Sequence, residues 1–223
     1  MTITRRKFLQ SASTLALVGG ILAAAGEAGL ALIRPAEADA VPMIELMAPG
    51  ALPDQVMGAS EAPVTIVEYA SMTCPHCAHF ANTTFPELKK RYIDTGKVKY
   101  IFREFPLDRL AVAGSLLARC AGEGDKYFAM IELLFNQQDK WVVRDPVPHL
   151  MDLAKQAGFT PDTFNACLKD QAMFDKIVKV REDAAAKFKV ESTPTFFING
   201  NKVAGALTID EMAKQIDPLL KSG

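Results

Sequence analysis

Two cysteines separated by two residues are the side chains of this 223-residue chain best suited to chemistry. Cys74 and Cys77 enclose Pro75 and His76. Thiols at this spacing fit across the first turn of a helix and can form a reversible disulfide. A cysteine at a helix N-terminus lies beside free N–H groups and the positive end of the helix dipole, and both favour its thiolate. We therefore expect a redox dithiol in which Cys74 ionises readily.

The two residues between the cysteines indicate the direction of the redox reaction. Pro75 suits an early helical position, because proline has no N–H to donate and its φ is already helical. A charged His76 would stabilise a thiolate on Cys74 further. A stable thiolate favours the reduced dithiol, so the disulfide form becomes a strong oxidant. The motif predicts an oxidase rather than a reductase.

The elements that must position this dithiol can be read on either side of it. The β-branched apolar run Val64–Ala70 predicts a buried strand directly before the motif, and residues 78–90 predict a helix after it. Glu68 is the one acid in the strand. It either lies buried beneath the cysteines, which its core-like neighbours Val67 and Tyr69 favour, or faces solvent at a sheet edge.

A second informative segment lies far downstream. Residues 196–198 and 203–204 predict two short strands, and Asn199-Gly200 between them is a strong hairpin signal because both central turn positions favour positive φ. Pro194 stands just ahead of the first strand, where proline is tolerated. The sequence therefore predicts a β-hairpin preceded by a proline.

Three groups of residues occur in an order that resembles one known family. Glu68 precedes Cys74 by six residues, the dithiol reads Cys-Pro-His-Cys, and residues 193–200 read Thr-Pro-Thr-Phe-Phe-Ile-Asn-Gly. Together they are similar to the DsbA family of thiol-disulfide oxidoreductases, from about Val56 to the C-terminus. The resemblance implies an α/β protein with a thioredoxin-like fold and an inserted α-helical subdomain.

The resemblance also implies roles for individual residues. In that family the residue matching Pro194 is cis and packs against the active disulfide, and the residue matching Thr193 offers its backbone to the substrate peptide. The acid matching Glu68 is buried and handles protons. Cys74, the more exposed sulfur, would form the mixed disulfide with substrate, and Cys77 would resolve it.

The implied partners follow from the same resemblance. The substrates would be reduced exported proteins, and a quinone-linked, DsbB-like membrane protein would restore the disulfide. No bound cofactor is needed. We expect a monomer. Isomerases of this type carry an extra dimerisation region, and residues 41–62 are too few for one, which argues against an isomerase. A disulfide isomerase or reductase of the same fold remains an alternative.

A metal site is the competing interpretation of the cysteine cluster. Cys74, His76, Cys77 and His79 are all possible zinc ligands. Four ligands within six residues of a helix cannot all face one point, so we predict no zinc site. A carrier that binds Cu(I) through the two thiols alone remains open, because Cu(I) favours thiolates.

The first forty residues are predicted to be a cleaved export signal. Residues 4–9 resemble a twin-arginine signal, a weakly apolar run follows over 15–33, and residues 38–40 supply a small-residue cleavage site after Ala40. The protein would then be periplasmic. A general secretory signal and a membrane anchor are the alternatives, and the weak hydrophobicity of the run argues against the anchor.

The rest of the chain divides into four predicted parts. Residues 41–62 form a lead segment, 63–107 the first part of the thioredoxin fold, 108–190 a helical insertion, and 191–223 the second part of the fold. The formal net charge of −1 gives no sign of the excess positive charge that is typical of nucleic-acid-binding proteins. Helices within the insertion are expected over residues 110–121, 126–138, 149–157 and 174–188, and Thr160 and Pro161 are expected to open a further one.

A second pair of cysteines, Cys120 and Cys167, falls on separate helices of this insertion. In an oxidising compartment an even number of cysteines favours pairing, so we predict a structural disulfide. Two buried free thiols are the alternative. Neither cysteine has a Pro-His pair beside it, so we assign them no catalytic role.

Overall fold

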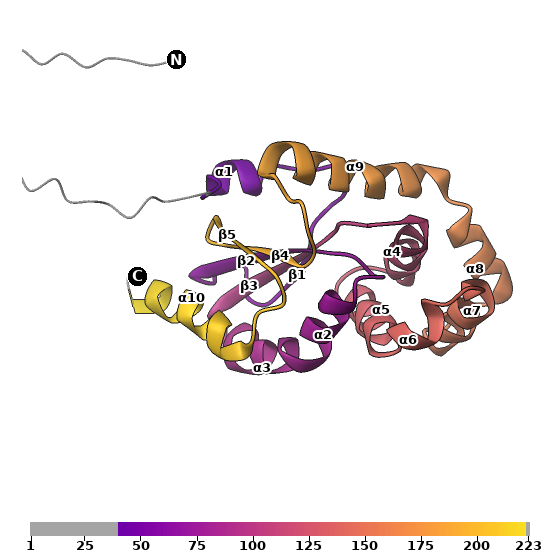
Figure 1. The fold of residues 1–223 in the computed structure, drawn as a ribbon, viewed down its shortest axis with the longest axis horizontal. Helices are drawn as coiled ribbons and strands as arrows, with labels where there is room; N and C mark the ends of the chain where they lie inside the picture. The colour runs from indigo at the N-terminus through magenta and orange to yellow at the C-terminus, as the bar shows by residue number, and fades with distance from the viewer. Residues whose placement is uncertain (1–39, 222–223) are drawn as a thin grey trace, which may run out of the picture. The chain divides into compact units, whose positions relative to one another are not determined.

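The fold is built on a five-stranded mixed sheet with the strand order β1-β3-β2-β4-β5 (Figure 1). The structure is a computed structural model, and it describes residues 40–221 of the chain. Strands β2 and β3 pair in parallel, and every other pair is antiparallel. The strands are β1 (Gln55–Met57), β2 (Val64–Ala70), β3 (Val98–Glu104), β4 (Thr195–Ile198) and β5 (Asn201–Ala204).

Helices cover both faces of the sheet. Figure 1 places α1 and α9 on one face, α2, α3 and α10 on the other, and α4 to α8 at one end of the sheet. The helices are α1 (Met43–Leu46), α2 (Pro75–Thr83), α3 (Phe85–Leu88), the π-helical turn η1 (Lys89–Ile93), α4 (Arg109–Ala121), α5 (Asp125–Asn136), α6 (Gln138–Trp141), α7 (Pro146–Gln156), α8 (Pro161–Leu168), α9 (Gln171–Phe188) and α10 (Ile209–Lys221). This is the predicted thioredoxin-like fold with an inserted helical subdomain.

Strand β2 is the centre of the core, and all seven of its residues are buried. Successive side chains of a strand point to opposite faces. Val67 and Tyr69 accordingly pack in the cluster that contains Phe188 of α9, while Ile66 packs in the cluster that contains Phe80 of α2. Glu68 has the same parity as Ile66 and so points to the face that α2 covers. The solvent-facing alternative for Glu68 is wrong, because β2 lies between β3 and β4.

The helix after the dithiol differs from the prediction. A single helix was expected over residues 78–90, but α2 ends at Thr83, and α3 and η1 follow as separate short segments. Pro86 lies in the first turn of α3. Proline cannot donate the backbone hydrogen bond that would continue α2, and its ring crowds the preceding turn, so the helix restarts there.

The lead segment predicted over residues 41–62 contains a strand that the sequence analysis did not anticipate. Strand β1 pairs antiparallel with β3, with Val56 opposite Ile101. Three residues are too few to show the alternating pattern by which a strand is recognised. The sheet therefore begins before residue 63, the start assigned to the thioredoxin-like part.

The insertion has the helices that the sequence predicted, with ends shifted by a few residues. The side chain of Asp108 accepts a hydrogen bond from the N–H of Ala111 and caps α4. Thr160 caps α8 through the N–H of Thr163, with Pro161 at the first helical position, as expected. A disulfide joins Cys120 of α4 to Cys167 of α8, whose Cα atoms lie 6.2 Å apart.

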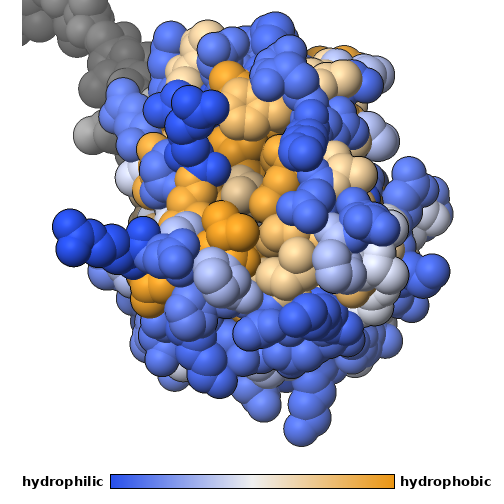
Figure 2. Space-filling model, turned by 90° about the vertical axis from the view of Figure 1, so that its right-hand side faces the viewer, coloured by the Kyte–Doolittle hydropathy of each residue, from blue (hydrophilic) through white to orange (hydrophobic). Residues whose placement is uncertain are grey.

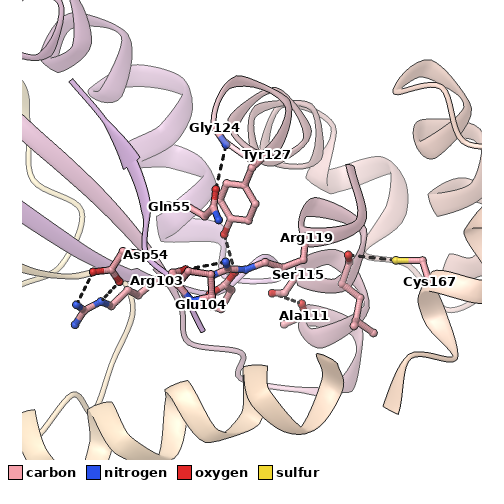
Figure 3. Close-up of polar contacts among 12 residues, drawn as sticks. Asp54, Gln55, Arg103, Glu104, Ala111, Ser115, Arg119, Gly124, Tyr127 and Cys167 are labelled. Atoms are coloured by element: carbon pink, nitrogen blue, oxygen red, sulfur yellow. Dashed lines mark hydrogen bonds and ion pairs between the residues drawn. The ribbon is translucent and has the colours of Figure 1, made fainter. Parts of the chain in front are cut away.

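Two ion pairs, one buried and one partly buried, tie neighbouring segments to β3 (Figure 3). Arg103 donates to both carboxylate oxygens of Asp54, at 2.7 and 2.9 Å. Arg119 of α4 donates to both oxygens of Glu104, at 2.5 and 2.8 Å, and the hydroxyl of Tyr127 donates to Glu104 at 2.8 Å. Because these charges are paired bidentately, they link the segment before β1, helix α4 and helix α5 to one strand.

The predicted export signal lies outside the described residues, apart from Ala40. Ala40 forms an isolated bridge with Asn201 of β5, and the N–H of Val41 donates to the carbonyl of Gly200 at 2.8 Å. Within residues 40–221, no helix has the length and apolar character needed to cross a bilayer.

Candidate active site

Cys74 occupies the N-cap position of α2, and Pro75 takes the first helical position. Cys74 has φ −77° and ψ 121°, which is extended backbone, so the chain changes from extended to helical conformation at this residue. The Cys74 thiol donates to the carbonyl of Thr193 at 3.3 Å. Cys74 is 5% exposed and Cys77 is fully buried, so Cys74 is the more exposed of the two cysteines, although only slightly. The backbone of Thr193 is therefore in direct contact with the Cys74 sulfur.

The surroundings of Cys74 stabilise its thiolate. They lower the pKa of Cys74 from 9.0 to about 5. The largest cause is a hydrogen bond from the Cys77 thiol to the Cys74 sulfur, which outweighs the opposing effect of burial. The backbone N–H groups of Cys77 and His76, at the start of α2, add to it. His76 thus contributes through its backbone, while its side chain is exposed.

Cys77 has the opposite character. Burial raises the pKa of the Cys77 thiol far above its ordinary value, and the nearby charges of Glu68 and Cys74 raise it further. A cysteine in this setting holds its proton while its neighbour gives one up. The two sulfurs of the motif are therefore chemically distinct, one a ready nucleophile and the other a thiol that needs a base.

Glu68 lies beneath the dithiol helix and is 2% exposed. Burial raises the pKa of Glu68 to about 8, although a hydrogen bond from the Tyr100 hydroxyl to its carboxylate opposes the rise. Tyr100 is on the neighbouring strand β3, two residues from Phe102, the residue that pairs with Glu68 in the sheet register. The carboxyl is therefore largely protonated at neutral pH and able to give or take a proton near it.

The hairpin segment completes the site. The Thr193–Pro194 peptide bond is cis, and β4 begins at the next residue. Pairing of Thr195 with Tyr69 brings this segment beside the end of β2, directly next to the dithiol. Among the residues that the structure describes, the hydroxyl of Thr193 is buried without a hydrogen-bond partner.

One residue that the sequence analysis missed also touches the dithiol loop. The side-chain amide of Gln138, in α6, donates to the carbonyls of Met72 and Cys74 at 2.9 and 3.0 Å. Gln138 lies 64 residues from Cys74 in the chain, and nothing in its local sequence marks it. It joins the helical insertion to the active-site loop.

The zinc interpretation finds no supporting geometry. Within the described part of the chain, no three His, Cys, Asp or Glu side chains are arranged to hold a metal ion. The side chain of His79 is exposed on α2. Cys74 and Cys77 are the free cysteines, since Cys120 and Cys167 are bonded to each other.

Known proteins are similar to this chain in sequence and in fold. Residues 51–218 match the thioredoxin family. Disulfide bond formation protein D of Bacillus subtilis is 32% identical over 178 residues, covering 74% of this chain and 77% of that protein. The crystal structure of alpha-DsbA1 from Wolbachia pipientis superposes with a TM-score of 0.75 at 35% identity, covering 80% of this chain and 96% of that one.

The chain belongs to the DsbA family.

Other relatives of this DsbA-family chain extend beyond the part that matches it. A Rickettsia bellii protein, whose name assigns it provisionally to the protein-disulfide oxidoreductases, is 35% identical over 175 residues, 74% of this chain and 68% of that protein. A similarly named Rickettsia felis protein is covered over 60% of its length. The chain thus spans between 60% and 68% of the length of these two rickettsial relatives.

As a DsbA-family member, the chain is a thiol-disulfide oxidoreductase. Such chemistry requires one sulfur that attacks or is attacked, and a second that closes the disulfide. The contrast between the Cys74 and Cys77 environments is what an unsymmetrical pair of this kind needs.

Proposed function

We propose that this chain is an exported oxidase that introduces disulfide bonds into newly translocated proteins through Cys74 and Cys77. The observation that carries the proposal is the position of Cys74 at the N-cap of α2, where the Cys77 thiol and backbone N–H groups lower its pKa to about 5, beside a fully buried Cys77 whose pKa is raised. The more stable the Cys74 thiolate is, the more strongly the disulfide form tends to accept electrons. An acidic first cysteine therefore favours an oxidase over a reductase.

The reaction proceeds by two thiolate attacks. A substrate thiolate attacks the Cys74 sulfur of the Cys74–Cys77 disulfide, and Cys77 leaves with the electron pair and takes up a proton. A second substrate thiolate then attacks the substrate sulfur of the mixed disulfide, so Cys74 leaves as a thiolate. The substrate loses two electrons and the enzyme dithiol gains them.

The remaining site residues assist these steps. Pro75 and His76 start α2, so that backbone N–H groups face the Cys74 sulfur. Glu68 exchanges a proton with Cys77. Thr193 presents its backbone to the substrate peptide, with Pro194 fixing the loop beside the sulfur.

Export and partners complete the proposal. Residues 1–40 would direct the chain through the twin-arginine route to the periplasm, with cleavage after Ala40. A quinone-linked membrane protein would reoxidise the dithiol, and the enzyme would act as a monomer.

An apolar surface on the insertion supports contact with unfolded substrates. Figure 2 looks at the end of the molecule that carries α7 and α8, and apolar side chains gather at its centre inside a polar border. Val142 and Val143, between α6 and α7, and Val147, in the first turn of α7, are exposed. Gln138 at the start of α6, four residues before Val142, donates to the carbonyl of Cys74, so this apolar surface is continuous in the chain with a segment that touches the dithiol loop.

The test is the equilibrium of the Cys74–Cys77 pair against glutathione, followed by transfer of the disulfide to a reduced test protein. We expect the pair to remain reduced in buffers that oxidise ordinary dithiols, and the oxidised form to transfer its disulfide stoichiometrically. A pair as hard to reduce as that of a reductase would contradict the proposal. Faster reshuffling of a scrambled protein than oxidation of a reduced one would favour the isomerase, and copper retained through purification would favour the metal carrier.

A further inference from the structure

A cavity of about 280 Å³ lies between α2, α3 and α5, on the face of the sheet to which Glu68 points. Its walls are mostly apolar, and their aromatic members are Phe80, Phe85, Tyr100, Phe102, Phe128 and Phe135. Glu68 itself is part of the lining. Neither cysteine of the dithiol lines this cavity, and neither Thr193 nor Pro194 does. It therefore reaches the buried acid from a side other than the substrate-binding one.

The mouth of the cavity is polar. Asn82 of α2 and Glu132 and Asn136 of α5 line it and are exposed, and Lys89 of η1 is half-buried there. A cavity of this size has room for several water molecules, and polar groups at the mouth and floor give them partners. The surface between α2 and α5 is thus connected to Glu68.

The chemistry of Cys77 creates a need for such a connection. When the disulfide opens, Cys77 leaves as a thiolate and must gain a proton, because burial strongly disfavours its charged form. Glu68 is the buried acid whose charge acts on Cys77. During this step the substrate is bonded to Cys74 and covers that side of the site. Glu68 must then recover its own proton from elsewhere.

We propose that this cavity is the route by which Glu68 exchanges protons with solvent while substrate occupies Cys74, and that the hydroxyl of Tyr100 is the positioning group that sets the proton affinity of Glu68. This inference rests on the proposed oxidase function. In the oxidising direction one proton passes from the Glu68 carboxyl to the Cys77 thiolate, and one proton from cavity water restores the carboxyl. The reverse reaction returns both protons by the same path.

The groups that face Glu68 are few. Tyr100 comes from β3, and Cys74 and Cys77 come from the start of α2. Lys89 and Glu132 stand at the cavity mouth. The Tyr100 hydroxyl donates directly to the Glu68 carboxylate, so it favours the charged form and lowers the pKa of the acid. Removing that hydroxyl should raise the pKa of Glu68 above about 8.

The first experiment compares Tyr100→Phe with Tyr127→Phe. Both changes delete a buried hydroxyl that donates to a buried carboxylate, but the partner of Tyr127 is Glu104, away from the dithiol. The readouts are the carboxyl titration of Glu68 by NMR in the reduced protein and the pH profile of single-turnover disulfide transfer to a cysteine peptide. We expect Tyr100→Phe to move both to higher pH, whereas Tyr127→Phe moves neither. Equal profiles for the two variants would overturn the role of Tyr100.

The second experiment obstructs the route without touching the acid. Ala81 lines this cavity, and Ala129 lines a separate one, so Ala81→Leu and Ala129→Leu add the same volume at the two places. We expect Ala81→Leu to slow transfer at neutral pH by at least about tenfold, because obstruction removes part of the roughly 10²–10⁴-fold that positioned proton transfer contributes to catalysis. Ala129→Leu should transfer at the wild-type rate. Equal rates for the two would overturn the cavity route.

The outcomes also separate this inference from the oxidase proposal. A wild-type protein that transfers no disulfide contradicts the proposed function itself. An active wild type whose Tyr100→Phe and Ala81→Leu variants match their controls contradicts only the proton route. Should Ala81→Leu fail to fold, the Glu68 titration in Tyr100→Phe still tests the positioning role.

Discussion

At the residue scale, the function depends on two sulfurs with unlike proton affinities. Cys74 sits at the end of a helix where hydrogen-bond donors converge, and Cys77 sits one turn inside, against the buried face. The two cysteines are three residues apart, so the Cys74 sulfur lies beside the free N–H groups of the helix start while the Cys77 sulfur is buried. Neither property belongs to cysteine in general, whose thiol titrates at about 8.5 when free.

The low pKa of Cys74 predicts how the stability of the reduced protein depends on pH. Its pKa falls from 9.0 to about 5 on folding, so ionisation stabilises the fold fully above pH 9, and the effect is lost as the pH falls towards 5. The oxidised protein has no such thiolate. We expect the melting temperature of the reduced form, measured relative to the oxidised form, to fall between pH 9 and 5. A difference that stays constant over this range would argue against a stabilised thiolate.

At the element scale, the helical insertion supports the site through α6. Gln138 binds two carbonyls of the dithiol loop, and Gly114 of α4 lies close to Met72, where an added Cβ would come within 3.0 Å of the Met72 Cβ. The insertion therefore packs against the dithiol loop, and its helices help to fix the position of the N-terminus of α2.

Replacing Gln138 tests this support. Gln138→Leu removes both hydrogen bonds to the loop at similar volume, so we expect the Cys74 thiolate to titrate at higher pH and the disulfide to become a weaker oxidant. Gln137→Leu is the control, because the side chain of Gln137 bonds only at the surface, to Gln156 and Lys140. The two variants should differ in thiolate absorbance against pH. Identical titrations would show that α6 merely covers the loop.

The second disulfide is also an element-scale feature, since it joins α4 to α8. The cysteines are 47 residues apart, and closing a loop of that length stabilises by about 4 kcal/mol in the chain-entropy account. We expect Cys120→Ala with Cys167→Ala to lower the denaturant midpoint clearly while disulfide transfer continues. Loss of transfer in a variant that remains folded would give this disulfide a part in the reaction.

Particular elements show how far the sequence could be interpreted. Strand β2 and the hairpin were predictable because their patterns are local, and the burial of Glu68 followed from its place in β2. Pro86 is a sequence signal for the break before α3, but the expected helix over residues 78–90 did not take it into account. Gln138 and Tyr100 were not predictable, because their contacts with Cys74 and Glu68 join residues 64 and 32 positions apart. The register of the sheet and the packing of the insertion decide those contacts.

At the scale of the whole molecule, the proposed export route would determine the state in which the enzyme arrives. The twin-arginine route carries folded cargo, and a protein that folds in a reducing cytosol keeps Cys74 and Cys77 as thiols. Such an enzyme would reach the periplasm folded but unable to oxidise, and its first oxidation would need the membrane partner.

A change in the leader tests this order of events. Arg5→Lys with Arg6→Lys keeps the positive charge but removes the arginine pair, so we expect the chain to remain inside the cell, folded and uncleaved. The measurement is the distribution of precursor and mature protein between cell fractions. Export at the normal rate would assign the leader to the general secretory route.

The titration of the Cys74 thiolate tests the central claim most directly. Thiolate absorbance is followed against pH in the reduced protein, with Cys74→Ala as the blank that assigns the signal. The account predicts one ionisation near pH 5, with Cys77 remaining a thiol across the neutral range. A Cys74 midpoint at or above the free-cysteine value of about 8.5 would contradict the oxidase.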